Sequence, residues 1–239
     1  MVDRRLPSLV TRYLERALPH GYARVDETVV KQLGEMWLKP GGRAIRFFAS
    51  ETFDVHEVAF WWRARFRLLP LVSLHVVDGF KDGRGILEGR LFGVPVMRQK
   101  GPDVSVGEAM RYLAELVWAP HAMIANRHLE WREVDDRTVE VVTSVGSTRA
   151  AVRLEFNAAG DIVGVRSDAR PYREGKTYVP RSWSGSFGDY ALFGEGTRIP
   201  TRGEVRWELP DGPYTYWRGT IMSLHHAFYI QRVEAGRGS

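Results

Sequence analysis

A period-two alternation of apolar and polar residues runs through most of this chain and limits the folds open to it. In residues 60–68 the apolar side chains alternate with Arg63, Arg65 and Arg67. Successive side chains of a β-strand point to opposite faces, so this pattern predicts a strand with one buried face. Similar runs occur at 45–53, 71–80, 86–96, 129–134, 138–145, 149–156, 162–170, 183–192, 204–209 and 214–223. Gly-, Pro- and Asp-containing segments between several of these runs are typical of turns.

Two segments show helical spacing instead. Within residues 1–20, apolar residues three and four apart predict an amphipathic helix that Pro19 ends, packed on the sheet or lying on a membrane surface. The segment 105–119 predicts an internal helix. It opens with Ser105 and Glu108 at the spacing of a capping box, in which each side chain bonds the other residue's backbone amide.

About ten strands with one helix among them predict a mainly β (α+β) protein, either a sandwich or a curved, partly closed barrel. No Ser- or Gly-rich linker divides the 239 residues, so we expect one domain over 1–239. The 8 tryptophans suit either a thick core or an aromatic-lined pocket.

Composition excludes several classes of function. The chain has no cysteine, which rules out disulfides, thiolate catalysis and Cys-based metal sites. Net charge is +5 without a polybasic block, so we expect no nucleic-acid partner. No run approaches the roughly 18 apolar residues of a membrane span, and the first residues lack a signal-peptide core. We therefore expect a cytoplasmic protein without an integral membrane anchor.

Motifs for cofactors and metals are also missing. Gly175-Lys176-Thr177 imitates the end of a phosphate loop, but the position that requires glycine holds Arg170. The seven histidines form neither a HExxH motif nor a same-face pair that favours zinc. We expect no cofactor and no metal.

Five segments resemble a bacterial family known as a domain of unknown function. They are WWRAR (61–65), VVDGF (76–80), GPDVSVGEAMRYLAELVWAP (101–120), the SW-G-DY stretch (182–190) and GTRIPTRGEVRW (196–207). The family is similar in build to LolA-like lipoprotein carriers. That resemblance implies a strongly curved antiparallel sheet, or half-barrel, wrapped around the internal helix and enclosing an apolar cavity. The chain departs from the family at His121, where a small residue is usual, and lacks the N-terminal membrane helices of many members.

If the helix crosses a concave sheet, its polar face points into the cavity. Arg111 and Glu115 are one turn apart and form either a surface ion pair or part of a site. A partly desolvated Glu115 could then act as a general base. We expect catalytic roles for Glu115, His121 and Arg111. The candidate substrate-binding residues are Arg65, His75, Asp78, Trp118, Tyr190, Trp207, Tyr216 and Arg218.

Three functions remain open at this point. The first is a cofactor-independent enzyme of the lyase, isomerase or cyclase type, acting by acid–base chemistry on a small hydrophobic or aromatic molecule. The second is a non-catalytic carrier of a lipid or another hydrophobic ligand, which needs only the cavity. The third is a protein-interaction module that uses the arginine-rich strand faces and the N-terminal helix.

Overall fold

The computed structural model describes residues 6–18, 21, 24–194 and 196–228, and the strands in them form one antiparallel sheet. The strands before the internal helix are β1 (Glu27–Met36), β2 (Ile45–Asp54), β3 (Phe60–Leu69), β4 (Val72–Lys81), β5 (Arg84–Leu91) and β6 (Val94–Lys100). Those after it are β7 (Glu130–Asp135), β8 (Thr138–Val145), β9 (Thr148–Phe156), β10 (Ile162–Glu174), β11 (Thr177–Phe193), β12 (Thr197–Leu209) and β13 (Gly212–Ala227). The helical segments are α1 (Ser8–Ala17), α2 (Pro102–Glu115), the 3-10 turn η1 (Leu116–Trp118) and α3 (Pro120–Ala125).

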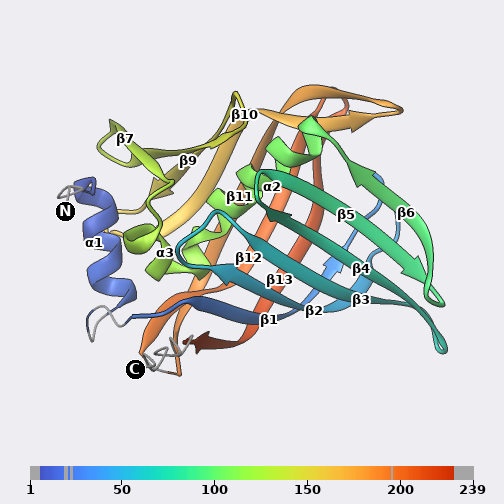
Figure 1. Ribbon diagram of the computed structural model, residues 1–239, viewed down its shortest axis with the longest axis horizontal. Helices are drawn as coiled ribbons and strands as arrows, with labels where there is room; N and C mark the ends of the chain where they lie inside the picture. Colours follow the sequence, from blue (N-terminus) through green and yellow to red (C-terminus); the bar gives the residue numbers. More distant parts are fainter. Residues whose placement is uncertain (1–5, 19–20, 22–23, 195, 229–239) are drawn as a thin grey trace, which may run out of the picture.

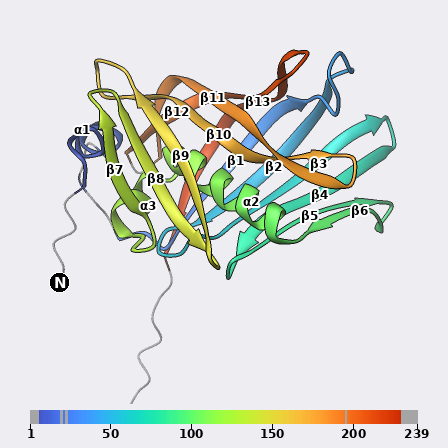
Figure 2. The ribbon, with the colours of Figure 1, turned by 90° about the horizontal axis from the view of Figure 1, so that it is seen from above.

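The sheet consists of two meanders that meet at its centre. Its strand order is β6-β5-β4-β3-β2-β1-β13-β12-β11-β10-β9-β8-β7, so only the β1–β13 pair joins strands distant in sequence. Strands of an antiparallel sheet twist relative to their neighbours, and the thirteen described strands curl into a half-barrel (Figures 1 and 2). The predicted curved antiparallel half-barrel is confirmed, and the sandwich alternative is wrong because the described strands form a single sheet.

Helix α2 crosses the concave side of this sheet (Figure 2). It leaves the edge strand β6 and contacts β4, β5 and β6 of one meander and β8, β9 and β10 of the other. Gly85 allows the close approach on β5, because a Cβ atom there would stand 2.9 Å from the Cα of Ser105. The helix therefore forms the inner layer against which both meanders pack.

The predicted start of the internal helix is wrong. The helix begins at Pro102, which is well suited to a first turn because it lacks an amide hydrogen. Ser105 therefore lies inside the helix, where its hydroxyl accepts a hydrogen bond from the Gly85 amide and donates to the Gly101 carbonyl. Glu108 is no capping partner. At the other end, residues 116–118 tighten into a 3-10 turn before Pro120 begins α3.

Helix α1 lies at one end of the half-barrel (Figure 1). It packs on the sheet, which is the first of the two placements predicted for the N-terminal helix. Its buried face is Leu9, Val10, Tyr13, Leu14 and Ala17. The hydroxyl of Tyr13 donates to the Val117 carbonyl and so links α1 to the turn after α2. The predicted stop at Pro19 lies outside the described residues.

Several strand boundaries follow the alternation, but β11 and β12 begin six and seven residues before the predicted runs at 183 and 204, and β1 was not among those runs. Residues 86–96 were predicted as one strand but form a hairpin, because Phe92 and Gly93 both adopt positive φ values, 50° and 81°. A phenylalanine with positive φ is uncommon, and its side chain is 75% exposed at this turn.

Candidate functional site

A cavity of about 430 Å³ lies between helix α2 and the concave face of the sheet. This volume falls within the range of small-molecule pockets. Leu38, Asp103 and Arg173 are exposed among its lining residues and mark its mouth. Its apolar walls are formed by Trp62, Phe66, Leu74, Val76, Leu87, Val104, Ala114, Trp118, Trp183, Phe187, Val205, Trp207, Tyr216 and Trp217.

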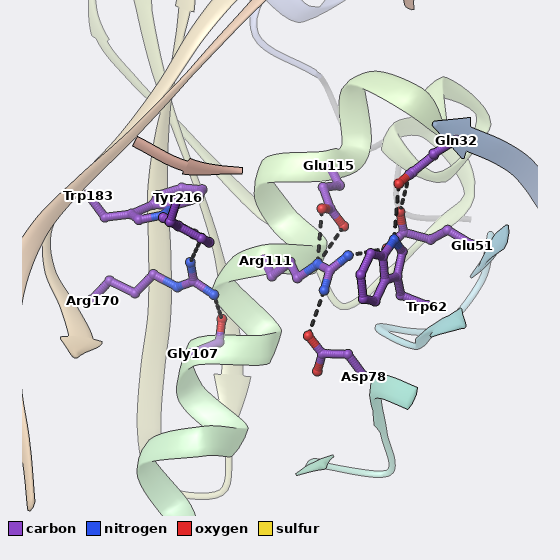
Figure 3. A network of polar contacts seen from close by, with 10 residues as sticks. All are labelled: Gln32, Glu51, Trp62, Asp78, Gly107, Arg111, Glu115, Arg170, Trp183 and Tyr216. Carbon is purple, nitrogen blue, oxygen red and sulfur yellow. Dashed lines mark hydrogen bonds and ion pairs between the residues drawn. The ribbon is translucent and has the colours of Figure 1, made fainter. Parts of the chain in front are cut away.

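Arg111 is the centre of a buried ionic cluster on the cavity side of α2 (Figure 3). Its guanidinium lies 2.6 Å from Asp78 Oδ2, 2.9 Å from Glu51 Oε1 and 3.0 Å from Glu115 Oε1. The same group stands 5.1 Å from the ring centroid of Trp62, within cation–π range. Since only 15% of the Arg111 side chain is exposed, this is no surface ion pair.

The side-chain amide of Gln32 and the indole of Trp62 hold Glu51 in position. Gln32 donates to Glu51 Oε2 at 2.7 Å, and the indole of Trp62 donates to Gln32 Oε1 at 3.0 Å. Glu51 is completely buried, and burial raises its pKa above the ordinary value. Strands β1, β2 and β3 thus each contribute one member to a chain of hydrogen bonds that ends at Arg111.

Arg170 enters the cavity from the opposite meander (Figure 3). Its guanidinium donates to the Gly107 carbonyl and to the Tyr216 hydroxyl, both at 3.2 Å. It stands 4.6 Å from the ring centroid of Trp183 and 5.4 Å from that of Trp207. The two arginines therefore lie on either side of α2, and each is packed against aromatic rings.

Glu108 and Asp78 bring two carboxyl groups together beside these arginines. Burial raises the pKa of Glu108 well above its ordinary value, and the neighbouring Asp78 raises it further. Burial likewise raises the pKa of Glu115, although Arg111 opposes the change. A carboxyl group with a raised pKa keeps its proton to a higher pH than a carboxyl group in water.

Six of the predicted site residues line this cavity. Arg111 and Glu115 project from α2, Asp78 from β4, and Trp118 from the turn after α2, where its indole donates to the Pro200 carbonyl. The remaining two, Trp207 on β12 and Tyr216 on β13, have stacked rings 6.1 Å apart. Their predicted roles in catalysis or binding stay predictions.

Three predicted residues lie on the outer face of the sheet instead. Arg65 and His75 are exposed and opposite each other on β3 and β4, because both are out of phase with the buried Trp62 and Asp78. Arg218 is also exposed and is 2.6 Å from Glu204 on the neighbouring strand. None of the three is part of the cavity lining.

The other two predicted residues are in different parts of the fold. Tyr190 donates to the Ile162 carbonyl and lies under the guanidinium of Arg198. His121 is buried at the start of α3 against the ring of His226, 4.6 Å away. Burial and the nearby His226 lower the pKa of His121 to about 4, so this side chain is neutral at pH 7.

Sequence reasoning missed Arg170, Glu108 and Glu51. The register of β10 and β11 shifts between Ser167 and Arg170, and this bulge turns Arg170 inward against the alternation counted from the buried Val165. Glu108 shares a helix face with Arg111 and Glu115, which was visible in the sequence, but a capping role was assigned to it. Glu51 lies in the predicted strand 45–53, and no neighbouring residue in the sequence indicates its hydrogen-bond partners Gln32 and Arg111.

Among the described residues, no three His, Asp or Glu side chains are arranged to hold a metal ion. The described helices include none that is long and apolar enough to cross a bilayer.

The fold and the cavity define a class of protein: a curved antiparallel half-barrel that encloses a small-molecule-sized hollow beneath an internal helix. The chain belongs to the family of unknown function DUF6544, whose model matches residues 2–219. No curated protein matches it significantly.

The solved structures that match this chain share little sequence identity with it. One is an outer membrane lipoprotein-sorting protein domain from Vibrio parahaemolyticus, with 8% identity, a TM-score of 0.48 and coverage of 93% of this chain and 94% of that one. Another is a DUF1329 family protein from Desulfovibrio piger, with 11% identity, a TM-score of 0.43 and coverage of 91% and 90%. A third is a β-barrel-like DUF1849 protein from Brucella abortus, with 9% identity, a TM-score of 0.28 and coverage of 87% and 100%.

Proposed function

We propose that this protein binds a small hydrophobic molecule in the cavity under α2 and acts as a carrier or binding protein. The observation that supports this most directly is the lining, which combines a volume of about 430 Å³ with many aromatic and aliphatic side chains. Each Å² of apolar ligand surface removed from water contributes about 25 cal/mol, and such a pocket can cover most of a small ligand.

The enzymatic alternative has less support. It assigned acid–base roles to Glu115 and His121, and His121 is not among the residues that line the cavity. Glu115 lies against Arg111, which suits a fixed polar wall as well as it suits a base. Binding requires neither residue to react. The cytoplasmic location expected from the sequence stays a prediction.

A cavity-blocking variant tests the proposal. Gly107 lines the cavity on α2, and a Cβ atom added there would meet nothing within 4 Å. We expect Gly107→Phe to fill the hollow without disturbing the helix, and Gly107→Ala to leave most of the space free. Binding of the neutral fluorescent probe N-phenyl-1-naphthylamine should weaken at least tenfold in Gly107→Phe and less than threefold in Gly107→Ala.

Native mass spectrometry of the purified protein supplies a second readout. A hydrophobic molecule retained by the wild type and absent from a folded Gly107→Phe variant supports the proposal. Equal probe binding by the wild type and Gly107→Phe, with unchanged circular dichroism, would contradict it.

A further inference from the structure

Two carboxyl oxygens of the cavity stand without a hydrogen-bond donor. Asp78 is 8% exposed and Glu108 is 9% exposed, and both line the hollow. Within the described part of the chain, no amide, hydroxyl or guanidinium group donates to Asp78 Oδ1 or Glu108 Oε2, so a proton held between the two carboxyl groups is the one donor left to them. A buried polar group without a partner is costly, so these two oxygens call for an explanation.

The arginines nearby do not supply the missing donors. Arg111 already binds Asp78 through Oδ2 and divides its other contacts between Glu51 and Glu115. Arg170 directs its two terminal nitrogens to the Gly107 carbonyl and the Tyr216 hydroxyl. The terminal nitrogens of Arg170 are therefore committed elsewhere, and its Nε, although buried and without a partner among the described residues, donates to neither carboxyl oxygen.

The cluster also contains more acid than base. Glu51, Asp78, Glu108 and Glu115 provide four carboxyl groups, whereas Arg111 and Arg170 provide two guanidinium groups. Fully ionised, these six side chains carry a net charge of −2 in a place where unpaired charge is unfavourable. The excess has to be neutralised by bound protons or by a cation.

The apolar walls favour a cation as well. Five of the 8 tryptophans line the cavity, and an aromatic face attracts a positive charge within about 6 Å of its centroid. The arginines already use this interaction, Arg111 against Trp62 and Arg170 against Trp183 and Trp207. The same walls that hold a hydrophobic body can therefore stabilise a cationic group attached to it.

We propose that the ligand of this cavity is a hydrophobic amine, whose ammonium group donates hydrogen bonds to Asp78 Oδ1 and Glu108 Oε2. This inference rests on the proposed binding function and names the chemical class of ligand. Without ligand, a proton on Glu108 is shared with Asp78, since two buried carboxylates side by side are unfavourable. An incoming ammonium group replaces that proton, which leaves to solvent, and the charge of the site stays constant.

Three probes with the same chain and different head groups test the inference: decylamine, decanol and decanoate. We expect decylamine to bind at least tenfold more tightly than decanol at pH 7, because its hydrogen bonds are charge-assisted. Decanoate should bind at least tenfold more weakly than decanol, because its charge repels the cluster. Calorimetry in two buffers of different ionisation enthalpy should show about one proton released for each decylamine bound.

Variants locate the effect. Glu108→Gln should remove most of the preference for decylamine over decanol, together with the proton release. Asp78→Asn gives a second, independent reading if Glu108→Gln fails to fold. Arg65→Gln on the outer face is the matched control and should keep the wild-type preference.

The outcomes separate the two proposals. If decanol binds but decylamine has no advantage, or if decanoate binds as tightly as decylamine, the amine assignment is overturned and the hydrophobic-binding proposal survives. If none of the three probes binds, the binding function itself fails. An advantage of decylamine that persists in both Glu108→Gln and Asp78→Asn would also overturn the assignment.

Discussion

Two ionic clusters in this protein have opposite compositions. In the cavity, Arg111 faces three carboxylates and Glu108 lies beside them. Near α1, one carboxylate, Asp161, lies between Arg16 at 2.9 Å and Arg198 at 2.6 Å. The first cluster contains surplus acid and raised carboxyl pKa values, and the second contains surplus base and an Asp161 pKa lowered to about 2.

The difference separates a structural cluster from a candidate site. Both oxygens of Asp161 accept hydrogen bonds from guanidinium groups, and its contacts join α1 to β12 across the end of the barrel. In the cavity, oxygens of Asp78 and Glu108 have no donor among the residues described. A cluster that serves stability satisfies its own groups, whereas one that serves a ligand leaves positions for the ligand to fill.

The largest expected effect comes from removing the centre of the cavity cluster. Arg111→Met leaves Glu51, Asp78 and Glu115 buried without their cation, and losing one partner of a buried pair costs about 3–5 kcal/mol. Urea denaturation at pH 7 measures the loss of unfolding free energy. The loss should shrink at pH 5, where the carboxyl groups can take up protons instead. Arg63→Met, on the exposed face of β3, is the control. A loss below 1 kcal/mol at pH 7 would mean that the carboxyl groups do not depend on Arg111.

Asp161→Asn should have the next largest effect. The folded-state pKa of Asp161, about 2, lies below its ordinary value of 3.8, so the ionised form stabilises the fold. This contribution, about 2 kcal/mol, is fully present above pH 4 and is lost as the pH falls through 2. Denaturation at pH 7 and at pH 2 should show a difference between wild type and variant that disappears in acid. Asp168→Asn, at an exposed pair with Arg153, should change stability by less than 0.5 kcal/mol, about the range of surface substitutions. A difference that is the same at both pH values would contradict the electrostatic explanation.

Glu108→Gln should show the opposite pH dependence. A carboxyl group whose folded pKa is raised binds more protons in the folded than in the unfolded state, so stability falls as pH rises above the unfolded value, about 4.3. One such group contributes a slope of about −1.4 kcal/mol per pH unit until the folded pKa is passed. The variant lacks this slope, so its stability relative to wild type should rise between pH 5 and pH 7. Glu155→Gln, an exposed carboxyl on β9, is the control. Parallel stability curves for wild type and Glu108→Gln would show that Glu108 is ionised throughout.

The half-barrel could be predicted to a large extent because its strands alternate faithfully. Residues 138–145 were predicted as a strand with the boundaries that β8 has, and 60–68 lies within β3. The alternation also places Asp78 and His75 on opposite faces of β4, as the structure shows. The alternation of side chains between the two faces is a local property of a strand and does not depend on which strand it pairs with.

The site could be predicted only in part, because its remaining members depend on non-local geometry. Arg170 faces inward after a bulge, and alternation counted from the buried Val165 points its side chain away from the cavity. Residue type alone does not distinguish Arg65 and Arg218 from the arginines of the cavity. The curvature of the sheet decides which of its faces is concave and therefore which arginines face the cavity. Glu108 was assigned to a cap because the helix was predicted to start at Ser105. The helix starts three residues earlier, at Pro102, so Glu108 lies inside it.

The smallest expected effect is on the outer face of the strands that carry the cavity cluster. Arg65 and His75 are cross-strand neighbours there, both exposed, and no ion pair involving either is found among the described residues. The double variant Arg65→Gln/His75→Gln should change the unfolding free energy by less than about 0.5 kcal/mol and leave binding of N-phenyl-1-naphthylamine unchanged. Denaturation and probe titration at pH 7 check both expectations. A binding loss above threefold would show that the outer face of β3 and β4 communicates with Trp62 and Asp78 on the inner face. The ligand binding of the cavity cluster would then depend on charges on both faces of the sheet, and not only on those of its inner face.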